Sequence, residues 1–124
     1  MSLENSNANQ PLNPTSVATV YLSTVINTAI AIVPAAANVN GCILHRATLD
    51  SLAFGNFALI HKNTPPTSII DGTLIETGTH HSINAATGVK LQMTKDIVVP
   101  AGRGIFLISD SVLPVFGNVQ VTNL

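Results

Sequence analysis

Four histidines are the side chains of this sequence best suited to metal binding or acid–base chemistry. His45 and His61 fall in segments with the composition of strands, whereas His80 and His81 are adjacent in a polar segment. A zinc site needs three or four ligands that converge on one point, and adjacent residues of a strand point to opposite faces. Two interpretations therefore stay open: an ordinary surface pair at His80–His81, or a metal site that this pair forms with His45 or His61. We expect the first, with no metal and no cofactor.

Nucleophilic and phosphate-binding motifs are missing from the sequence. Cys42 is the single cysteine, so it has no partner for a disulfide or a Cys-x-x-Cys pattern, and we expect a small buried side chain there. There is no Gly-x-Ser-x-Gly elbow and no Walker loop. The carboxylates of Asp50, Asp71 and Asp110 fit turns and strand ends. These observations favour a protein that is not an enzyme and has no catalytic residue.

The composition limits the possible partners. The chain has 124 residues, of which 46% are hydrophobic and only 9% charged, with a formal net charge of −1. Five Lys and Arg residues cannot form the basic face that nucleic-acid binding requires. A small, apolar domain with almost no net charge tends to associate with other copies. We therefore expect no nucleic-acid partner and a homo-oligomer.

One uncharged stretch raises the question of a membrane span. No charged residue lies between Glu4 and Arg46, and residues 17–37 are rich in Val, Ile and Ala. Polar residues interrupt this stretch, Pro34 ends it, and no Lys or Arg flanks it. The N-terminus also lacks the basic and apolar regions of a secretory signal. We expect no membrane partner and no secretion by that route.

The elements that would position these side chains are strands. Val, Ile and Thr occur throughout, with turn signals every eight to fifteen residues and no extended helical periodicity. Strands are expected at residues 17–22, 25–33, 42–49, 57–62, 68–70, 73–76, 89–93, 97–99, 105–108 and 115–121. Simple alternation would place His45 on the same face as Ile43 and Ala47. The expected fold class is all-β: an antiparallel β-sandwich or jelly-roll-like barrel with an extended N-terminal arm.

Two parts of the chain are distinguished by composition. Residues 1–16 are rich in Asn, Ser and Pro and are expected to form a flexible N-terminal arm, followed by a single β domain at 17–124. Segment 25–33 is apolar on both faces of the predicted strand. This pattern predicts either a central strand or a strand in a subunit interface.

Two resemblances to known families add to this. The segment 96–104, Asp-Ile-Val-Val-Pro-Ala-Gly-Arg-Gly, resembles the Pro-x-Gly turn of cupins, which are jelly-roll proteins that often bind a metal through histidines. The family's histidine shortly after the glycine is replaced here by Gly104, Ile105 and Phe106. This resemblance therefore implies a jelly-roll turn and not the cupin metal site.

The second resemblance rests on the arm, on Ile-Val-Pro-Ala-Ala-Ala-Asn-Val-Asn-Gly-Cys-Ile-Leu at 32–44, and on Asp-Ile-Val-Val-Pro-Ala-Gly-Arg-Gly-Ile-Phe-Leu at 96–107. Together these resemble small bacteriophage virion proteins of the head-decoration (cement) or minor capsid type. The resemblance implies a structural protein of the virion, made in the cytoplasm of the host, that contacts the major capsid protein or another virion protein. With this role the expected homo-oligomer is a trimer. Its arm would make the contacts, through Asn9, Pro11, Leu12 and Pro14.

Two alternatives belong to other functional classes. One is a small ligand-binding module of cupin or lectin type, with His45, His61, His80, His81 and Arg103 around a pocket. The other is the receptor-binding tip of a fibre. Metal content and oligomeric state distinguish the first alternative from a decoration protein.

Overall fold

The computed structural model describes residues 15–51, 55–79, 89–93 and 95–124. This part of the chain is almost entirely β-structure, with one short 3-10 helix and no α-helix. The elements are β1 (Thr15–Ser23), β2 (Ile30–Val33), η1 (Ala35–Ala37), β3 (Cys42–Ser51), β4 (Asn56–Lys62), β5 (Thr73–Thr79), β6 (Val89–Gln92), β7 (Ile97–Val99), β8 (Gly104–Ser109) and β9 (Pro114–Asn123). No helix in the described ranges is long and apolar enough to cross a membrane.

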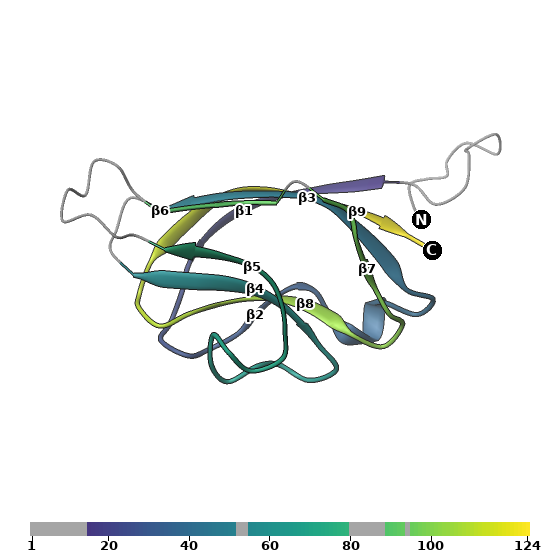
Figure 1. The fold of residues 1–124 in the computed structure, drawn as a ribbon, viewed down its shortest axis with the longest axis horizontal. Coiled ribbons are helices and arrows are strands. Elements are labelled where there is room, and N and C mark those ends of the chain that lie inside the picture. Colours follow the sequence, from purple (N-terminus) through teal and green to yellow (C-terminus); the bar gives the residue numbers. More distant parts are fainter. Residues whose placement is uncertain (1–14, 52–54, 80–88, 94) are drawn as a thin grey trace.

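The strands form two antiparallel sheets that face each other (Figure 1). The first sheet has the order β1-β9-β3-β6, and β7 also pairs with β3. The second sheet has the order β2-β8-β4-β5. At one side of the sandwich β5 lies close to β6, so the two sheets approach each other there. The predicted all-β, antiparallel fold is confirmed, and its two sheets are arranged as in a sandwich.

Alternation along the strands explains why the two sheets pack together. In β9, Val115, Val119 and Val121 are buried, as their spacing predicts. Leu91 and Met93 point inward from the edge of the first sheet in the same way. One core cluster joins both sheets, so the two sheets share one interior. Its buried members are Cys42, Leu44, Ala47, Leu49, Phe57, Leu59, Leu91, Met93, Val99, Ile105, Leu107, Leu113, Val115, Val119 and Val121.

The outer face of the second sheet is covered as well. Ala58, Ile60 and Ile108 are fully buried on that face, where Ala29 and Ile69 pack against them. The connection 63–72 between β4 and β5 supplies part of this cover. β4 and β8 are therefore apolar on both faces, which explains the continuous hydrophobic runs in their sequences.

A polar network closes the end of the sandwich where β4 begins and β8 ends. The Asn56 main-chain N–H and side-chain amide donate to the carboxylate of Asp110 over 3.0 and 2.8 Å. Burial raises the pKa of Asp110, but the hydrogen bonds from Asn56 and Ser111 together lower it below its ordinary value. The buried Thr24 hydroxyl donates to the main-chain oxygen of Ser111 over 2.7 Å. The network joins the connection between β1 and β2 to the β8–β9 turn.

The structure corrects the predicted element boundaries at three places. β1 spans Thr15–Ser23, so it is longer at both ends than the strand predicted at 17–22. The strand predicted at 25–33 is shortened to β2, because Asn27 adopts a positive φ of 53° and Val25 bridges to Thr28 in a turn. The strand predicted at 68–70 does not form, since that segment folds over the second sheet.

β2 is an edge strand of the second sheet and not a central one. It is the first strand in the order of the second sheet and pairs only with β8 among the described strands. Ile30, Ile32 and Val33 are half-buried, and the preceding Val25 and Ile26 are exposed. The prediction that this apolar segment forms a central strand is therefore wrong. A place in a subunit interface stays a prediction.

Candidate functional site

An open apolar groove lies at the end of the sandwich that carries η1. Its volume is about 190 Å³, and it runs between the edge of the second sheet and β9 of the first. The residues that line it are Ile32, Val33, Pro34, Ala37, Val119, Val121 and Asn123. None of these side chains is charged, so the groove is suited to an apolar and uncharged occupant.

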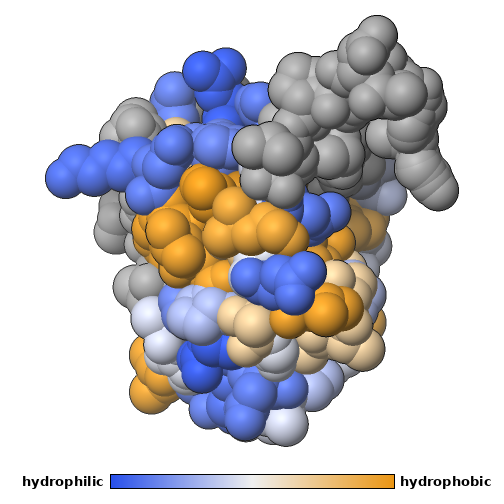
Figure 2. Space-filling view, turned by 90° about the vertical axis from the view of Figure 1, so that its right-hand side faces the viewer, coloured by the Kyte–Doolittle hydropathy of each residue, from blue (hydrophilic) through white to orange (hydrophobic). Residues whose placement is uncertain are grey.

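The surface around the groove is also apolar. Figure 2 shows this end, with hydrophobic residues gathered between hydrophilic regions above and below. Val39, Val98 and Leu124 have exposed fractions of 72%, 63% and 43%. Leu124 is held there by its main-chain N–H, which donates to the carbonyl oxygen of Gly41 over 3.0 Å. We refer to the groove together with these three residues as the apolar end. Exposed apolar patches of this kind often mark interaction sites.

The apolar end is held together by hydrogen bonds of Asn38, which we call the Asn38 clasp. This side chain is buried, and its amide nitrogen lies 2.9 Å from the carbonyl oxygens of Pro100 and Arg103 and 3.4 Å from that of Val99. The Gly102 main-chain N–H donates to the Asn38 carbonyl oxygen over 2.7 Å. These bonds fasten η1 to the turn between β7 and β8. Asn38 Oδ1 is buried without a hydrogen-bond partner among the described atoms.

The first strand of the described chain begins beside this groove. Thr15, the first residue of β1, pairs with Thr122, whose neighbour Asn123 lines the groove. Figure 1 shows the start of β1, the end of β9 and η1 at the same end of the sandwich. The predicted contact residues Asn9, Pro11, Leu12 and Pro14 lie outside the described residues.

His45 occupies a β-bulge on the outer face of the first sheet. The pairing of β3 with β9 shifts between Leu44 and Arg46, so His45 is the extra residue. As a result Ala47 is buried while His45 is half-buried, which corrects the prediction that alternation places them on one face. Its Nδ1 lies 3.1 Å from Asp96 Oδ2, and its Nε2 lies 2.7 Å from Thr122 Oγ1.

A polar hollow lies beside His45. It has a volume of about 360 Å³ and is lined by His45, Arg46, Thr48, Gln92 and Met93. Asp96 and Thr122 hold the imidazole at the rim of this hollow by its two ring nitrogens. A threonine hydroxyl, a histidine and an aspartate follow one another here in the order of a hydrolytic triad. Asp96 is however largely exposed, with 64% of its side chain accessible, so water screens its effect on the imidazole.

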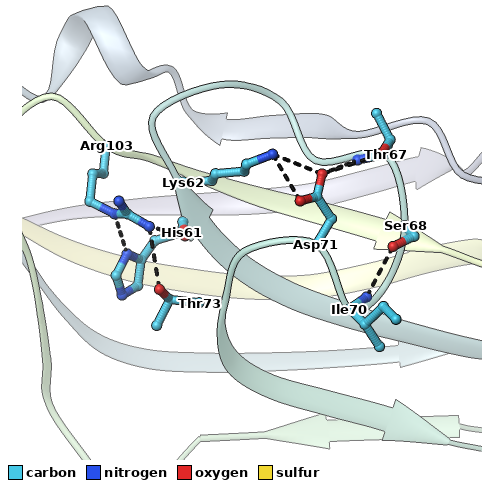
Figure 3. A network of polar contacts seen from close by, with 8 residues as sticks. All are labelled: His61, Lys62, Thr67, Ser68, Ile70, Asp71, Thr73 and Arg103. Atoms are coloured by element: carbon cyan, nitrogen blue, oxygen red, sulfur yellow. Dashed lines mark hydrogen bonds and ion pairs between the residues drawn. The ribbon is translucent and has the colours of Figure 1, made fainter.

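His61 lies in the second sheet, at the end of β4, in the network of Figure 3. Arg103 Nε donates to His61 Nδ1 over 2.8 Å, and Arg103 Nη2 donates to the His61 carbonyl oxygen over 2.9 Å and to Thr73 Oγ1 over 3.3 Å. Because Nδ1 accepts, the imidazole is neutral and carries its proton on Nε2. Burial of the ring, followed by the charge of Arg103, lowers the pKa of His61.

A second part of this network fixes the connection between β4 and β5. Lys62 Nζ lies 2.9 and 2.8 Å from the two carboxylate oxygens of Asp71. The same carboxylate accepts the main-chain N–H of Thr67 over 2.9 Å. The hydrogen bond from Lys62, followed by that from the Thr67 main chain, lowers the pKa of Asp71. These contacts hold the 63–72 connection over the outer face of the second sheet.

The histidines are therefore divided between two places. The structure brings the predicted residues His61 and Arg103 into contact, but His45 is on the other sheet with different partners. His80 and His81 lie outside the described residues. Within the described ranges, no three His, Cys, Asp or Glu side chains lie close enough together to hold a metal ion. Cys42 is buried as predicted, and its burial raises the pKa of the thiol.

Sequence reasoning misses Asn38 and the groove. The run Ala35-Ala36-Ala37-Asn38 indicates only the end of a strand, because the carbonyls that Asn38 binds are 61 to 65 residues further along the chain. The one available signal is the position of Asn38, directly after three alanines and shortly before the turn dipeptide Asn40-Gly41. Asparagine side chains in turns often form hydrogen bonds with nearby main-chain groups. The chain matches no model of a protein family, no curated protein and no solved structure.

Proposed function

We propose that the protein is a non-enzymatic structural subunit that forms a homo-oligomer and attaches to a bacteriophage particle as a decoration or minor structural protein. The observation that carries this proposal is the apolar end. An open groove without charged residues and three exposed aliphatic side chains lie where the first residues of the chain join the domain. Such a surface is suited to contact with another protein chain.

The order of the strands supports a jelly roll as the finer description of the fold. β6 and β7 both pair with β3, on different parts of its length, so together they occupy the place of one interrupted strand. Each sheet then has four antiparallel strands, and an early strand lies beside a late one in both sheets. Eight strands in two such sheets are typical of jelly rolls, which include viral capsid domains, lectins and cupins. The fold alone does not select among these functions.

The two segments that resemble virion proteins meet in space, which supports the particle assignment. Segment 32–44 contains the groove residues of β2 and η1, and segment 96–107 contains β7 and the start of β8. They are joined by the pairing of Cys42 with Val99 and by the Asn38 clasp. The motifs behind the resemblance therefore lie together in space, and with the end of β9 they form the apolar end, which is the proposed contact region.

A second apolar feature offers a contact for another virion protein. Tyr21 and Phe116 pair across β1 and β9 on the outer face of the first sheet, with ring centroids 6.4 Å apart. Tyr21 is 87% exposed and Phe116 36% exposed. Aromatic side chains of this kind are common in the centres of protein interfaces.

The oligomer is tested by measuring the mass of the purified protein by light scattering at several concentrations. A stable assembly of three or more chains is expected, and a monomer at every concentration would refute the proposal. Removal of residues 1–14, which leaves β1 intact, is expected to reduce the mass or weaken the assembly. The particle assignment is tested separately by detecting the protein in purified virions from its source; its absence from them would refute that part.

A second candidate function rests on the hollow beside His45. Its polar lining is suited to a small ligand with several hydroxyl groups, as in a lectin. Binding of soluble glycans that is lost in His45→Ala and retained in His61→Ala would favour this function. Equal binding by both variants, or none by the wild-type protein, would remove it.

A further inference from the structure

We infer that Asn40–Gly41 is a site of spontaneous deamidation, which turns an exposed asparagine into aspartate or isoaspartate and places a negative charge at the apolar end. This is the one Asn-Gly pair in the sequence. The modification itself is independent of the proposed function. Its effect, a weaker contact between copies of the chain, rests on the proposed homo-oligomer.

The reaction needs water and no other reagent. The main-chain nitrogen of Gly41 attacks the side-chain carbonyl carbon (Cγ) of Asn40, a C–N bond forms, and the bond from Cγ to the side-chain nitrogen breaks. The proton of the attacking N–H passes through solvent to the leaving nitrogen, which departs as ammonia. Water then opens the resulting five-membered succinimide at either carbonyl, so the product is aspartate or isoaspartate. No group is oxidised or reduced.

The main chain at this place requires the glycine that makes the asparagine reactive. Gly41 has a positive φ of 94°, which residues with a Cβ rarely adopt. A Cβ there would also lie 3.4 Å from the carbonyl oxygen of Val99. Because glycine has no Cβ, nothing hinders the approach of its nitrogen to the preceding side chain. The fold therefore fixes a reactive pair in the turn before β3.

The reacting groups of Asn40 and Gly41 are not held apart by other bonds. Asn40 is exposed, and its side chain forms no hydrogen bond within the described part of the chain. The Gly41 N–H donates none of the main-chain hydrogen bonds of the described turns and loops. Gly41 itself is buried, so its N–H reaches water when the turn opens locally. Segments outside the core strands open at a low free-energy cost, so we expect the reaction to proceed in the folded protein.

Asp71–Gly72 shows the opposite arrangement. An Asp-Gly pair can close the same ring with loss of water, and this is the only such pair in the sequence. Here the carboxylate is held by Lys62 Nζ over 2.8 and 2.9 Å and by the Thr67 main-chain N–H over 2.9 Å. These contacts keep the carboxylate ionised, and an ionised carboxylate is a poor electrophile. We therefore expect isomerisation at Asp71 to be slower than deamidation at Asn40.

The product would lie at the apolar end. Asn40 directly follows the exposed Val39, and the Gly41 carbonyl oxygen accepts the Leu124 N–H over 3.0 Å. The side chains of the apolar end are uncharged, so the new carboxylate has no cation among them to pair with. One added negative charge changes the formal net charge from −1 to −2. Covering an unpaired charge with a second copy is costly, and two such charges on facing copies repel each other.

Peptide mass spectrometry of the incubated protein tests the site. A dilute sample, in which contact between copies does not cover Asn40, is kept at mildly alkaline pH and digested at intervals. The expected result is a gain of one dalton at Asn40 that accumulates several-fold faster than at Asn63. Asn63 is the matched control, because it is also exposed but precedes Thr64, whose branched Cβ hinders ring closure. Asn38, which is buried and precedes Val39, should stay unchanged.

Three substitutions test the effect on association, which light scattering measures. Asn40→Asp makes the product directly and is expected to weaken association by about tenfold or more. Asn63→Asp adds the same charge in the 63–72 connection, outside the apolar end, and should leave association unchanged. Asn40→Gln keeps an amide but would have to close a six-membered ring. Its association should therefore persist during an incubation in which that of the wild type declines.

The outcomes separate the modification from the proposed function. Conversion at Asn40 that is absent, or no faster than at Asn63, would refute the deamidation site whatever the oligomeric state. Conversion together with unchanged association of Asn40→Asp would refute the effect at the apolar end and leave the oligomer intact. A wild-type protein that is monomeric at every concentration would refute the proposed function and the effect on association, while the mass measurement would still decide the modification.

Discussion

Replacement of Asn38 by alanine should destabilise the domain by about 2 kcal/mol. The side chain is 1% exposed, and its amide faces three main-chain carbonyls, two of them 2.9 Å away. An amide has two hydrogens, so we count two good hydrogen bonds. A buried acceptor that loses its donor costs about 1–3 kcal/mol. The lower end applies to these two acceptors, because Pro100 is exposed and Arg103 half-exposed, so water can reach their oxygens.

Asn38→Asp provides the sharper test of the same clasp. A carboxylate at this position would face the carbonyl oxygens of Val99, Pro100 and Arg103. An unpaired buried charge costs about 3–5 kcal/mol, so at neutral pH this variant should be less stable than Asn38→Ala. Protonation would turn the carboxylate into a donor. The pKa of the new carboxyl would therefore be raised by folding, and the difference between the two variants should shrink as the pH falls.

Urea unfolding measures these effects through the transition midpoint at constant m-value. Asn40→Ala is the matched control, since Asn40 is exposed two residues away, and a change below about 0.5 kcal/mol is expected for it. If Asn38→Ala unfolds within that range of the wild type, or if Asn38→Asp is the more stable of the two variants at pH 7, then Asn38 does not fasten η1 to the β7–β8 turn.

Three further predictions concern other parts of the sandwich. Folding lowers the pKa of His61, so this residue favours the folded state above its ordinary pKa of 6.5, and that contribution should be lost as the pH falls through the folded-state pKa. The wild-type protein should therefore have a lower urea midpoint at pH 5 than at pH 7.5. In His61→Asn the difference between the two midpoints should be smaller. A Cβ on Gly117 would overlap the main chain of Thr48, so Gly117→Ala should cost more than about 3 kcal/mol or abolish folding. Gly102→Ala, with open space around its Cβ and a φ of +82°, should cost only about 1–2 kcal/mol. Urea unfolding measures both glycine variants, and equal stability of the two would contradict this prediction. Asp71→Asn should make the 63–72 connection several-fold more sensitive to limited proteolysis. Lys62→Gln should have a smaller effect, because it leaves the hydrogen bond from Thr67 to Asp71 in place. Equal cleavage of the wild type and of both variants would contradict this prediction.

Local patterns predict the strands well where one face is buried. The alternation of Val115, Val119 and Val121 identifies the inner face of β9, and that of Leu91 and Met93 identifies the inner residues at the edge of the first sheet. Periodicity carries this information because successive side chains of a strand point to opposite faces. The all-β fold class follows from such segments and from the turns between them.

Other features depend on contacts that the sequence does not display. Segment 25–33 has the composition of a long strand, but the positive φ of Asn27 interrupts it and the order of the strands places β2 at an edge. The bulge at His45 shifts the alternation by one residue, and the pairing that defines it involves β9, more than 70 residues away. Asn38 and its carbonyl partners are similarly distant. Alternation identifies faces, whereas these features require knowledge of which strands are neighbours.

The order of the strands also has a consequence for how a newly made chain folds. β9 lies between β1 and β3 in the first sheet, and β8 lies between β2 and β4 in the second. During synthesis the first two strands along the chain therefore emerge without their main-chain partners, which are the last two. Neither sheet can close until β8 and β9 have left the ribosome, and pairings of such long sequence separation form slowly, in about milliseconds to seconds. In that interval the apolar strands are exposed to one another and to other chains. The fold is thus completed by its final strands, and the yield of native protein should depend on how quickly those strands take the central positions.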